Sequence, residues 1–146
     1  MVEALNRLNF LCNTIPAKLK NFSEEVFSYK LAPAKWSKKE TTGHLVDSAA
    51  NNIQRFIRMQ YENVPFIIYA QNDWVNLQHH QTKNSSEVIA LWELLNRHIV
   101  HALKNVPEKN YSLLCKTNEP EPVTLLWLAE DYVKHLEHHL RQVVHY

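Results

Sequence analysis

Apolar residues recur every three or four positions along four stretches of the chain, which is the spacing of one buried face on an α-helix. In the first stretch, from Val2 to about Lys30, they are Leu5, Leu8, Leu11 and Ile15. Because proline suits the first turn of a helix, Pro16 predicts a break and a restart near Ile15. Ser23 predicts the cap of a further short helix that runs through Tyr29.

The second stretch has the clearest helix start. Ser37 and Glu40 form the capping-box pattern, in which each side chain binds the backbone N–H of the other residue. The helix is expected to run to about Tyr61 with an apolar stripe at Leu45, Ala49, Ile53, Phe56 and Ile57. The following segment, Val64–Thr82, predicts an irregular connection with a short helix around Trp74, although its first residues also suit a short strand.

The last two stretches predict two more helices. One begins at Ser85 or Ser86 and reaches about Asn105, and the other begins after a cap at Thr124 and reaches about Val144. The stripe of the last helix is Leu125, Leu128, Tyr132, His135 and His139. Four amphipathic helices, with a longer crossover between the second and the third, predict an all-α four-helix bundle.

Length and composition narrow the class further. The 146 residues predict one domain, residues 1–146, and the only glycine, Gly43, leaves no means of building a P-loop or a Rossmann turn. The net charge of +1 gives no electrostatic case for nucleic acid or an anionic membrane. Two cysteines make no disulfide framework, and neither a signal-peptide pattern nor a membrane-spanning apolar run is present, so a cytoplasmic protein is expected.

Histidine is the abundant residue, with nine in the chain. His135 and His139 are four residues apart on one helical face and continue an apolar stripe, so they are expected to point into the bundle. Two buried imidazoles without partners would be costly to desolvate. A shared metal ion is one resolution, and hydrogen bonds to neighbouring polar side chains are the other.

A third candidate, His44, heads a polar line on the second helix that continues through Ser48, Asn51 and Arg55. This line borders the apolar stripe, so it either lines a pocket or faces solvent. Three histidine ligands would leave a metal with an open position, as in catalytic zinc sites. Asp47 and Asp131, each one turn from a candidate ligand, would then orient the ligand imidazoles, or else would be surface charges.

The other histidines favour structural or solvent-exposed roles. His138 is expected at the edge of the bundle, His98 and His101 partly exposed, and the pair His79 and His80 solvated in the crossover. No glutamate has a histidine three residues later, which excludes the di-iron carboxylate bundles.

Three blocks of the chain together resemble the DinB/YfiT-like superfamily. They are Trp36-Ser-Lys-Lys-Glu40, Gly43-His-Leu-Val-Asp47 and His135-Leu-Glu-His-His-Leu-Arg-Gln142, in the family's order and spacing. The middle segment, Tyr69–Val75, resembles the YfiT-like branch. One departure is Leu136, which stands where many relatives carry aspartate, next to a ligand position rather than at one.

The resemblance implies an up-down-down-up four-helix bundle with a divalent metal bound by His44, His135 and His139. It also implies a hydrolase or a thiol S-transferase that uses a low-molecular-weight thiol such as bacillithiol, in a homodimer. Zinc or nickel is the expected metal, with iron or manganese as alternatives.

The candidate catalytic residues beside the metal are Asp47, Asn51 and Arg55. Asp47 would orient a ligand, while Asn51 and Arg55 would bind an anionic group of a small-molecule substrate, a carboxylate in the case of Arg55. A surface salt bridge is the alternative role for Arg55. The rival hypothesis for the whole protein is a non-catalytic, homodimeric binding module with a structural metal or none.

Overall fold

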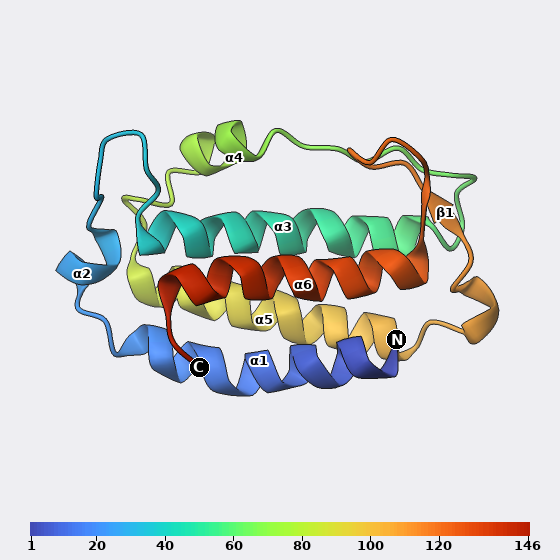
Figure 1. Cartoon of the computed structure of the whole chain (residues 1–146), viewed down its shortest axis with the longest axis horizontal. Helices are drawn as coiled ribbons and strands as arrows, with labels where there is room; N and C mark the ends of the chain where they lie inside the picture. The colour runs from blue at the N-terminus through green and yellow to red at the C-terminus, as the bar shows by residue number, and fades with distance from the viewer.

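The computed structural model describes residues 1–146 and contains four long helices that pack side by side (Figure 1). They are α1 (Val2–Lys20), α3 (Lys38–Arg58), α5 (Ser85–Lys104) and α6 (Leu125–Val143). In Figure 1, α1 and α6 run from right to left, and α3 and α5 run from left to right. The predicted all-α four-helix bundle, with its long crossover between the second and third long helices, is confirmed.

Five short elements lie between the long helices. They are α2 (Glu24–Ser28), α4 (Gln71–Leu77), the 3-10 helix η1 (Glu108–Asn110) and the strands β1 (Leu114–Cys115) and β2 (Val123–Thr124). The sequence predicted both short α-helices, but not η1 or the antiparallel strand pair. Lys116, just after β1, exchanges backbone hydrogen bonds with Pro65 and Ile67 at 2.9 and 3.1 Å. These bonds attach the crossover to the strand pair, above the start of α6 (Figure 1).

The predicted helix caps set the starts of α3 and α6, the two helices that carry the site. Ser37 Oγ accepts a hydrogen bond from the backbone N–H of Glu40 at 3.0 Å, and the Glu40 carboxylate accepts one from the backbone N–H of Ser37 at 2.8 Å. Thr124 Oγ1 accepts from the backbone N–H of Trp127 at 3.2 Å. Each bond satisfies an N–H group that the first helical turn leaves without a partner.

The predicted break at Pro16 is wrong, because α1 continues through it as one helix. A proline inside a helix removes the N–H that would bind the carbonyl four residues earlier, here that of Cys12. The structure supplies a substitute donor, since Arg97 Nη2 on α5 lies 3.1 Å from the Cys12 carbonyl oxygen. A contact between two helices therefore replaces the bond that proline deletes.

The bounds of α3, α5 and α6 lie close to the predicted ones. α3 ends at Arg58, three residues before the predicted Tyr61. α5 begins at Ser85 and ends at Lys104, as predicted to within one residue, and its cap is Asn84, whose side chain accepts from the backbone N–H of Ser86 at 2.9 Å. The last helix ends at Val143, as predicted to within one residue. Helix ends are the least sharply specified part of a hydrophobic pattern, because the buried stripe does not depend on them.

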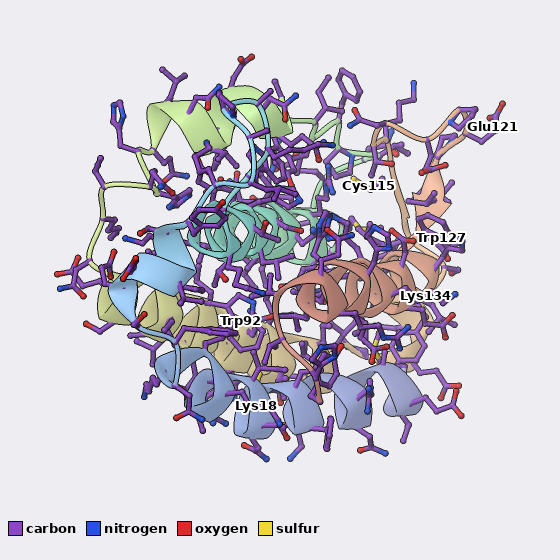
Figure 2. All side chains as sticks on the ribbon, turned by 60° about the vertical axis from the view of Figure 1, so that its left-hand side comes forward. Lys18, Trp92, Cys115, Glu121, Trp127 and Lys134 are labelled. Carbon is purple, nitrogen blue, oxygen red and sulfur yellow. The ribbon has the colours of Figure 1, made fainter.

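A single apolar core lies between the long helices. It comprises 26 buried residues, and Trp92 on α5 is the largest of its fully buried side chains. Figure 2 shows Trp92 inside the bundle and Glu121 at the periphery. Next to Trp92, the buried Tyr132 hydroxyl donates to Asn96 Oδ1 at 2.7 Å. None of the helices combines the length and apolar character needed to cross a bilayer.

Candidate metal centre and adjoining cavity

Three histidines from two helices meet in the bundle: His44 of α3 with His135 and His139 of α6. One ring nitrogen from each lies within 4.8 Å of the other two, and the Nε2 atoms of His44 and His135 are 3.3 Å apart. His135 and His139 are one turn apart on α6 and therefore share a face. The structure thus brings together the three residues that the sequence singled out.

Burial keeps these imidazoles neutral. The His44 side chain is fully buried, and desolvation, with the neighbouring His135 and His139, lowers its pKa to about 3. Desolvation likewise lowers the pKa of His139 to about 4, and it lowers the pKa of His135. A histidine binds metal through the lone pair of a neutral ring, so at neutral pH all three rings are in the ligating form.

The donor set fits a divalent metal ion. His44 Nδ1 and His139 Nδ1 are buried without a hydrogen-bond partner, so protein hydrogen bonds leave the rings unsatisfied. Three imidazole ligands leave at least one position open in a tetrahedral zinc site, and imidazole also suits nickel and iron. The Trp36 ring lies 5.0 Å from that of His44, between ring centres, and encloses the cluster on that side.

A buried histidine–aspartate pair, which the sequence did not indicate, lies beside the cluster. His80, at the end of the crossover, is 2% exposed, and its Nε2 lies 3.0 Å from Asp47 Oδ1 on α3. Gln78 Nε2 donates to the same carboxylate oxygen. The prediction that His80 is solvated is wrong, because this contact across 33 residues buries it. Asp47 therefore binds the crossover rather than one of the three clustered rings.

Gly43 makes the burial of His80 possible. A Cβ atom at Gly43 would lie 2.3 Å from His80 Cγ, far inside van der Waals contact. Glycine in the middle of a helix lowers stability by roughly 0.5–1 kcal/mol relative to alanine, so its presence there indicates a close approach by another group. The one glycine of the chain was the available signal for this contact, although it does not name the partner.

The remaining predicted residues have separate positions. Asn51 Nδ2 donates to the Asp47 carbonyl oxygen at 2.9 Å, and Asn51 is not among the residues that line the nearby cavity. Arg55 does line it: its Nε and Nη2 donate to the Ile67 carbonyl oxygen at 3.0 and 2.7 Å. Asp131 also lines the cavity and makes no hydrogen bond to the imidazole of His135, which it was expected to orient.

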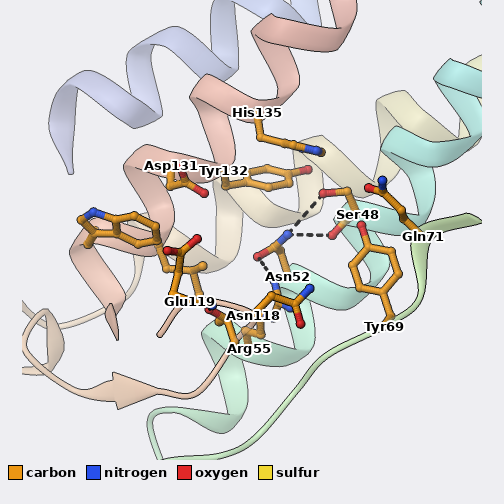
Figure 3. Close-up of a pocket in the computed structure, with 13 residues that line it drawn as sticks. Ser48, Asn52, Arg55, Tyr69, Gln71, Asn118, Glu119, Asp131, Tyr132 and His135 are labelled. Carbon is orange, nitrogen blue, oxygen red and sulfur yellow. Dashed lines mark hydrogen bonds between the residues drawn. The ribbon is translucent and has the colours of Figure 1, made fainter. Parts of the chain in front are cut away.

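This cavity, of about 210 Å³, lies along the interface between α3 and α6, and His135 is the one histidine of the cluster that lines it. Because the two helices are antiparallel, the lining residues lie farther from the cluster as the residue number rises along α3 and as it falls along α6. On α3 these are Ser48, Asn52 and Arg55, and on α6 they are His135, Tyr132, Asp131, Leu128 and Trp127. Tyr69 and Gln71 of the crossover and Asn118 and Glu119 of the loop between β1 and β2 complete the wall (Figure 3).

The other histidines lie outside the cluster. His98 and His101 are exposed on α5, and His138 is exposed on α6, with its Nε2 3.0 Å from Gln142 Nε2. Their exposure provides matched control positions for tests of the cluster.

The family model of the DinB superfamily matches residues 12–143. The chain therefore belongs to the DinB superfamily, which the sequence blocks around the three histidines had indicated.

Two solved structures share the fold. YfiT from Bacillus subtilis, described as a probable metal-dependent hydrolase with an unusual four-helix bundle topology, is 23% identical, with a TM-score of 0.81 over 95% of this chain and 83% of its own. A mycothiol-dependent maleylpyruvate isomerase is 15% identical, with a TM-score of 0.72 over 94% of this chain. The chain spans 58% of the isomerase chain. A comparison with curated proteins found no match.

Proposed function

We propose that this protein is a metal-dependent enzyme that acts on a small molecule bound in the cavity beside His135. The observation that carries the proposal is the cluster itself: three imidazole nitrogens lie within 4.8 Å of one another, and one of the three residues, His135, lines a cavity. A divalent metal ion there would act as a Lewis acid, lowering the pKa of water or of a substrate thiol toward neutrality.

The three histidines and the residues near them have separate roles in this proposal: metal binding, substrate binding and positioning. His44, His135 and His139 hold the ion, and their low pKa values keep their lone pairs free at neutral pH. Arg55, at the far end of the cavity, binds a carboxylate of the substrate. Asp47 is a positioning residue, because it fixes the crossover against α3 through His80.

Asn51 has a supporting role in this proposal. Its side-chain amide binds the backbone carbonyl of Asp47, one turn earlier on α3. It therefore steadies the turn of helix that separates His44 from the cavity wall rather than touching substrate.

Two reactions suit this arrangement, hydrolysis and thiol transfer. The description of one structural relative, a probable metal-dependent hydrolase, supports hydrolysis, and that of the other, a mycothiol-dependent isomerase, supports the use of a low-molecular-weight thiol. We favour a low-molecular-weight thiol or water as the nucleophile, zinc or nickel as the metal, and a cytoplasmic homodimer as the setting. Both cysteines are free and buried, which suits a reducing compartment.

The first test is the metal content of protein purified without a nickel column. We expect about one divalent ion per chain in the wild type and in the control His98→Ala. We expect substantially less in His44→Ala and in His139→Ala, since each removes one of three ligands. Equal metal content in all four proteins would contradict the proposed centre.

The second test separates the reaction classes from the non-catalytic alternative. Metal-loaded protein is given electrophilic substrates and activated esters, with and without added thiol, and product is measured by mass spectrometry. Conjugation that requires both thiol and metal supports a transferase, and thiol-independent cleavage supports a hydrolase. No turnover, with a dimer that persists without metal, favours a binding module.

A further inference from the structure

The cavity contains a buried cation that has no anionic partner. Arg55 is 7% exposed and forms no ion pair. Its hydrogen bonds go to neutral acceptors, the Ile67 carbonyl and Asn52 Oδ1. Three of the five N–H groups of the guanidinium are used, so one on Nη1 and one on Nη2 remain. A buried charge normally has a counter-charge, and here the open cavity is where one can bind.

The same cavity contains a carboxylate without a partner. Asp131 is half-buried and makes no hydrogen bond or ion pair with another residue, and burial raises its pKa. Glu119, in the loop between β1 and β2, lies on the same side, and Figure 3 shows the two carboxylates together. Trp127 also lines the cavity.

We propose that the cavity binds a zwitterion: an amino acid, or the amino-acid portion of a larger substrate, with its carboxylate on Arg55 and its primary ammonium on Asp131. The two protein charges line one cavity and attract each other only through space, with neither a hydrogen bond nor an ion pair between them, so each can take a direct partner from a ligand. A ligand with only one charge would satisfy one of them and leave the other desolvated. A ligand with both charges satisfies the two together.

The volume and the order of the groups define the ligand more closely. A cavity of about 210 Å³ holds a metabolite of amino-acid size rather than a drug-sized molecule, which needs roughly 300 Å³ or more. Asp131 is one helical turn, about 5.4 Å, from His135. The ammonium would therefore lie close to the proposed metal, and the reacting group, a thiol or a carbonyl, would be within a few bonds of the amino group.

The inference deepens the proposed function in its choice of substrate class, but binding of the zwitterion does not require metal. The test is an NMR titration of ¹⁵N-labelled protein, with and without one equivalent of Zn²⁺, using three probes of matched size. L-2-aminobutyrate carries both charges, butyrate only the carboxylate, and propylamine only the ammonium. We expect L-2-aminobutyrate to bind at least about tenfold more tightly than either of the others, with shifts at the amides of Asn52 and Asp131.

Asp131→Asn is the discriminating variant, because its side chain makes no internal contact whose loss would disturb the fold. It should reduce the preference for L-2-aminobutyrate over butyrate to about one, while the neighbouring Glu130→Gln should retain the full preference. Equal affinity for the three probes, no binding, or an unchanged preference in Asp131→Asn would overturn the inference. Metal content, measured separately, decides the proposed function, so failure of one is distinguishable from failure of the other.

Discussion

Helices α1 and α3 are of similar length and both pack into the bundle, yet the buried residues of α1 are all apolar whereas those of α3 are apolar and polar together. All seven buried residues of α1 are apolar: Ala4, Leu8, Leu11, Cys12, Ile15, Pro16 and Leu19. The buried polar and charged residues of α3 include Lys39, Glu40, Thr42, His44, Asp47, Ser48, Asn51, Asn52 and Arg55. One helix therefore supplies burial, and the other supplies chemistry within the same core.

This division explains how the bundle tolerates unsatisfied groups. His44 Nδ1, Asp47 Oδ2 and His80 Nδ1 are buried without partners, and each such atom costs about 1–3 kcal/mol. Apolar burial along α1 and α5 offsets that cost. Natural proteins concentrate such departures at functional sites, and here four of the six unpartnered buried atoms belong to the histidine cluster or to the adjoining pair of Asp47 and His80.

The difference between α1 and α3 predicts that the largest loss of stability follows from a substitution in α1. Leu11→Ala truncates a fully buried side chain, so the free energy of unfolding should fall by about 2–5 kcal/mol. Metal content per folded chain should stay unchanged, because Leu11 is neither one of the three clustered histidines nor a residue that lines the cavity. Urea denaturation measures the loss, with the exposed Asn9→Ala as the control. A loss below about 1 kcal/mol would show that α1 does not carry the stability assigned to it.

Gly43→Ala tests whether the packing of the crossover on α3 depends on the close contact between Gly43 and His80. At an exposed helical glycine, alanine would stabilise by roughly 1 kcal/mol. Here the new Cβ would clash with His80, so we expect a net loss of about 1–3 kcal/mol. Hydrogen exchange should also accelerate over residues 71–80, as the crossover separates from Asp47. The control is the exposed Gln54→Ala, and stabilisation by Gly43→Ala would contradict the packing described.

Acid should destabilise the metal-free protein through the histidine cluster. The folded-state pKa of His44 is about 3, below the ordinary value of 6.5, so the unfolded chain binds more protons between these values. Stability is therefore fully present above pH 6.5 and is lost as the pH falls toward 3. For His44 alone the loss between pH 7 and pH 5 is about 2 kcal/mol.

Urea denaturation at the two pH values measures that loss. His44→Ala should reduce the pH dependence, and the exposed His98→Ala should leave it intact. A pH dependence that is the same in both variants would assign the acid sensitivity to other groups.

The last prediction concerns the cysteines of the apolar core and involves no substitution. Burial raises the pKa of Cys12 to about 11 and also raises that of Cys115, so little thiolate is present at pH 8. Alkylation by iodoacetamide should be at least about a hundredfold slower in the native protein than in urea. Rapid native labelling would mean that the core opens more readily than the packing around α1 implies.

Local rules predicted the long helices and the histidine pair on α6, while His44, 91 residues from His135, joined that pair through the resemblance to the DinB/YfiT-like superfamily. The capping patterns at Ser37 and Thr124 and the i, i+4 spacing of His135 and His139 depend on residues that are neighbours in sequence, so they can be recognised without the fold. The failures involve partners far apart in sequence. Arg97 donates a hydrogen bond to the Cys12 carbonyl, 85 residues away in sequence, and so replaces the bond that Pro16 removes. No local pattern predicts that contact.

The candidate site also contains residues that the sequence identified and contacts that it did not. The sequence identified the three clustered histidines and placed Arg55 on the line that reaches the cavity. It did not indicate the pairing of His80 with Asp47, nor the part that Glu119 and Trp127 play in the cavity wall. Those contacts depend on how the crossover and the β1–β2 loop cover the bundle, and irregular segments carry too little periodicity to show where they fold.

The most direct test of the central claim is X-ray absorption spectroscopy of the zinc-loaded protein. The account predicts that three imidazole nitrogens bind the zinc at about 2.0–2.1 Å, together with one oxygen ligand from solvent. His44→Ala should lose one imidazole from that shell or lose the metal, while His98→Ala should give the wild-type spectrum. A shell with fewer than three imidazoles in the wild type, or one unaltered by His44→Ala, would contradict the proposed metal centre.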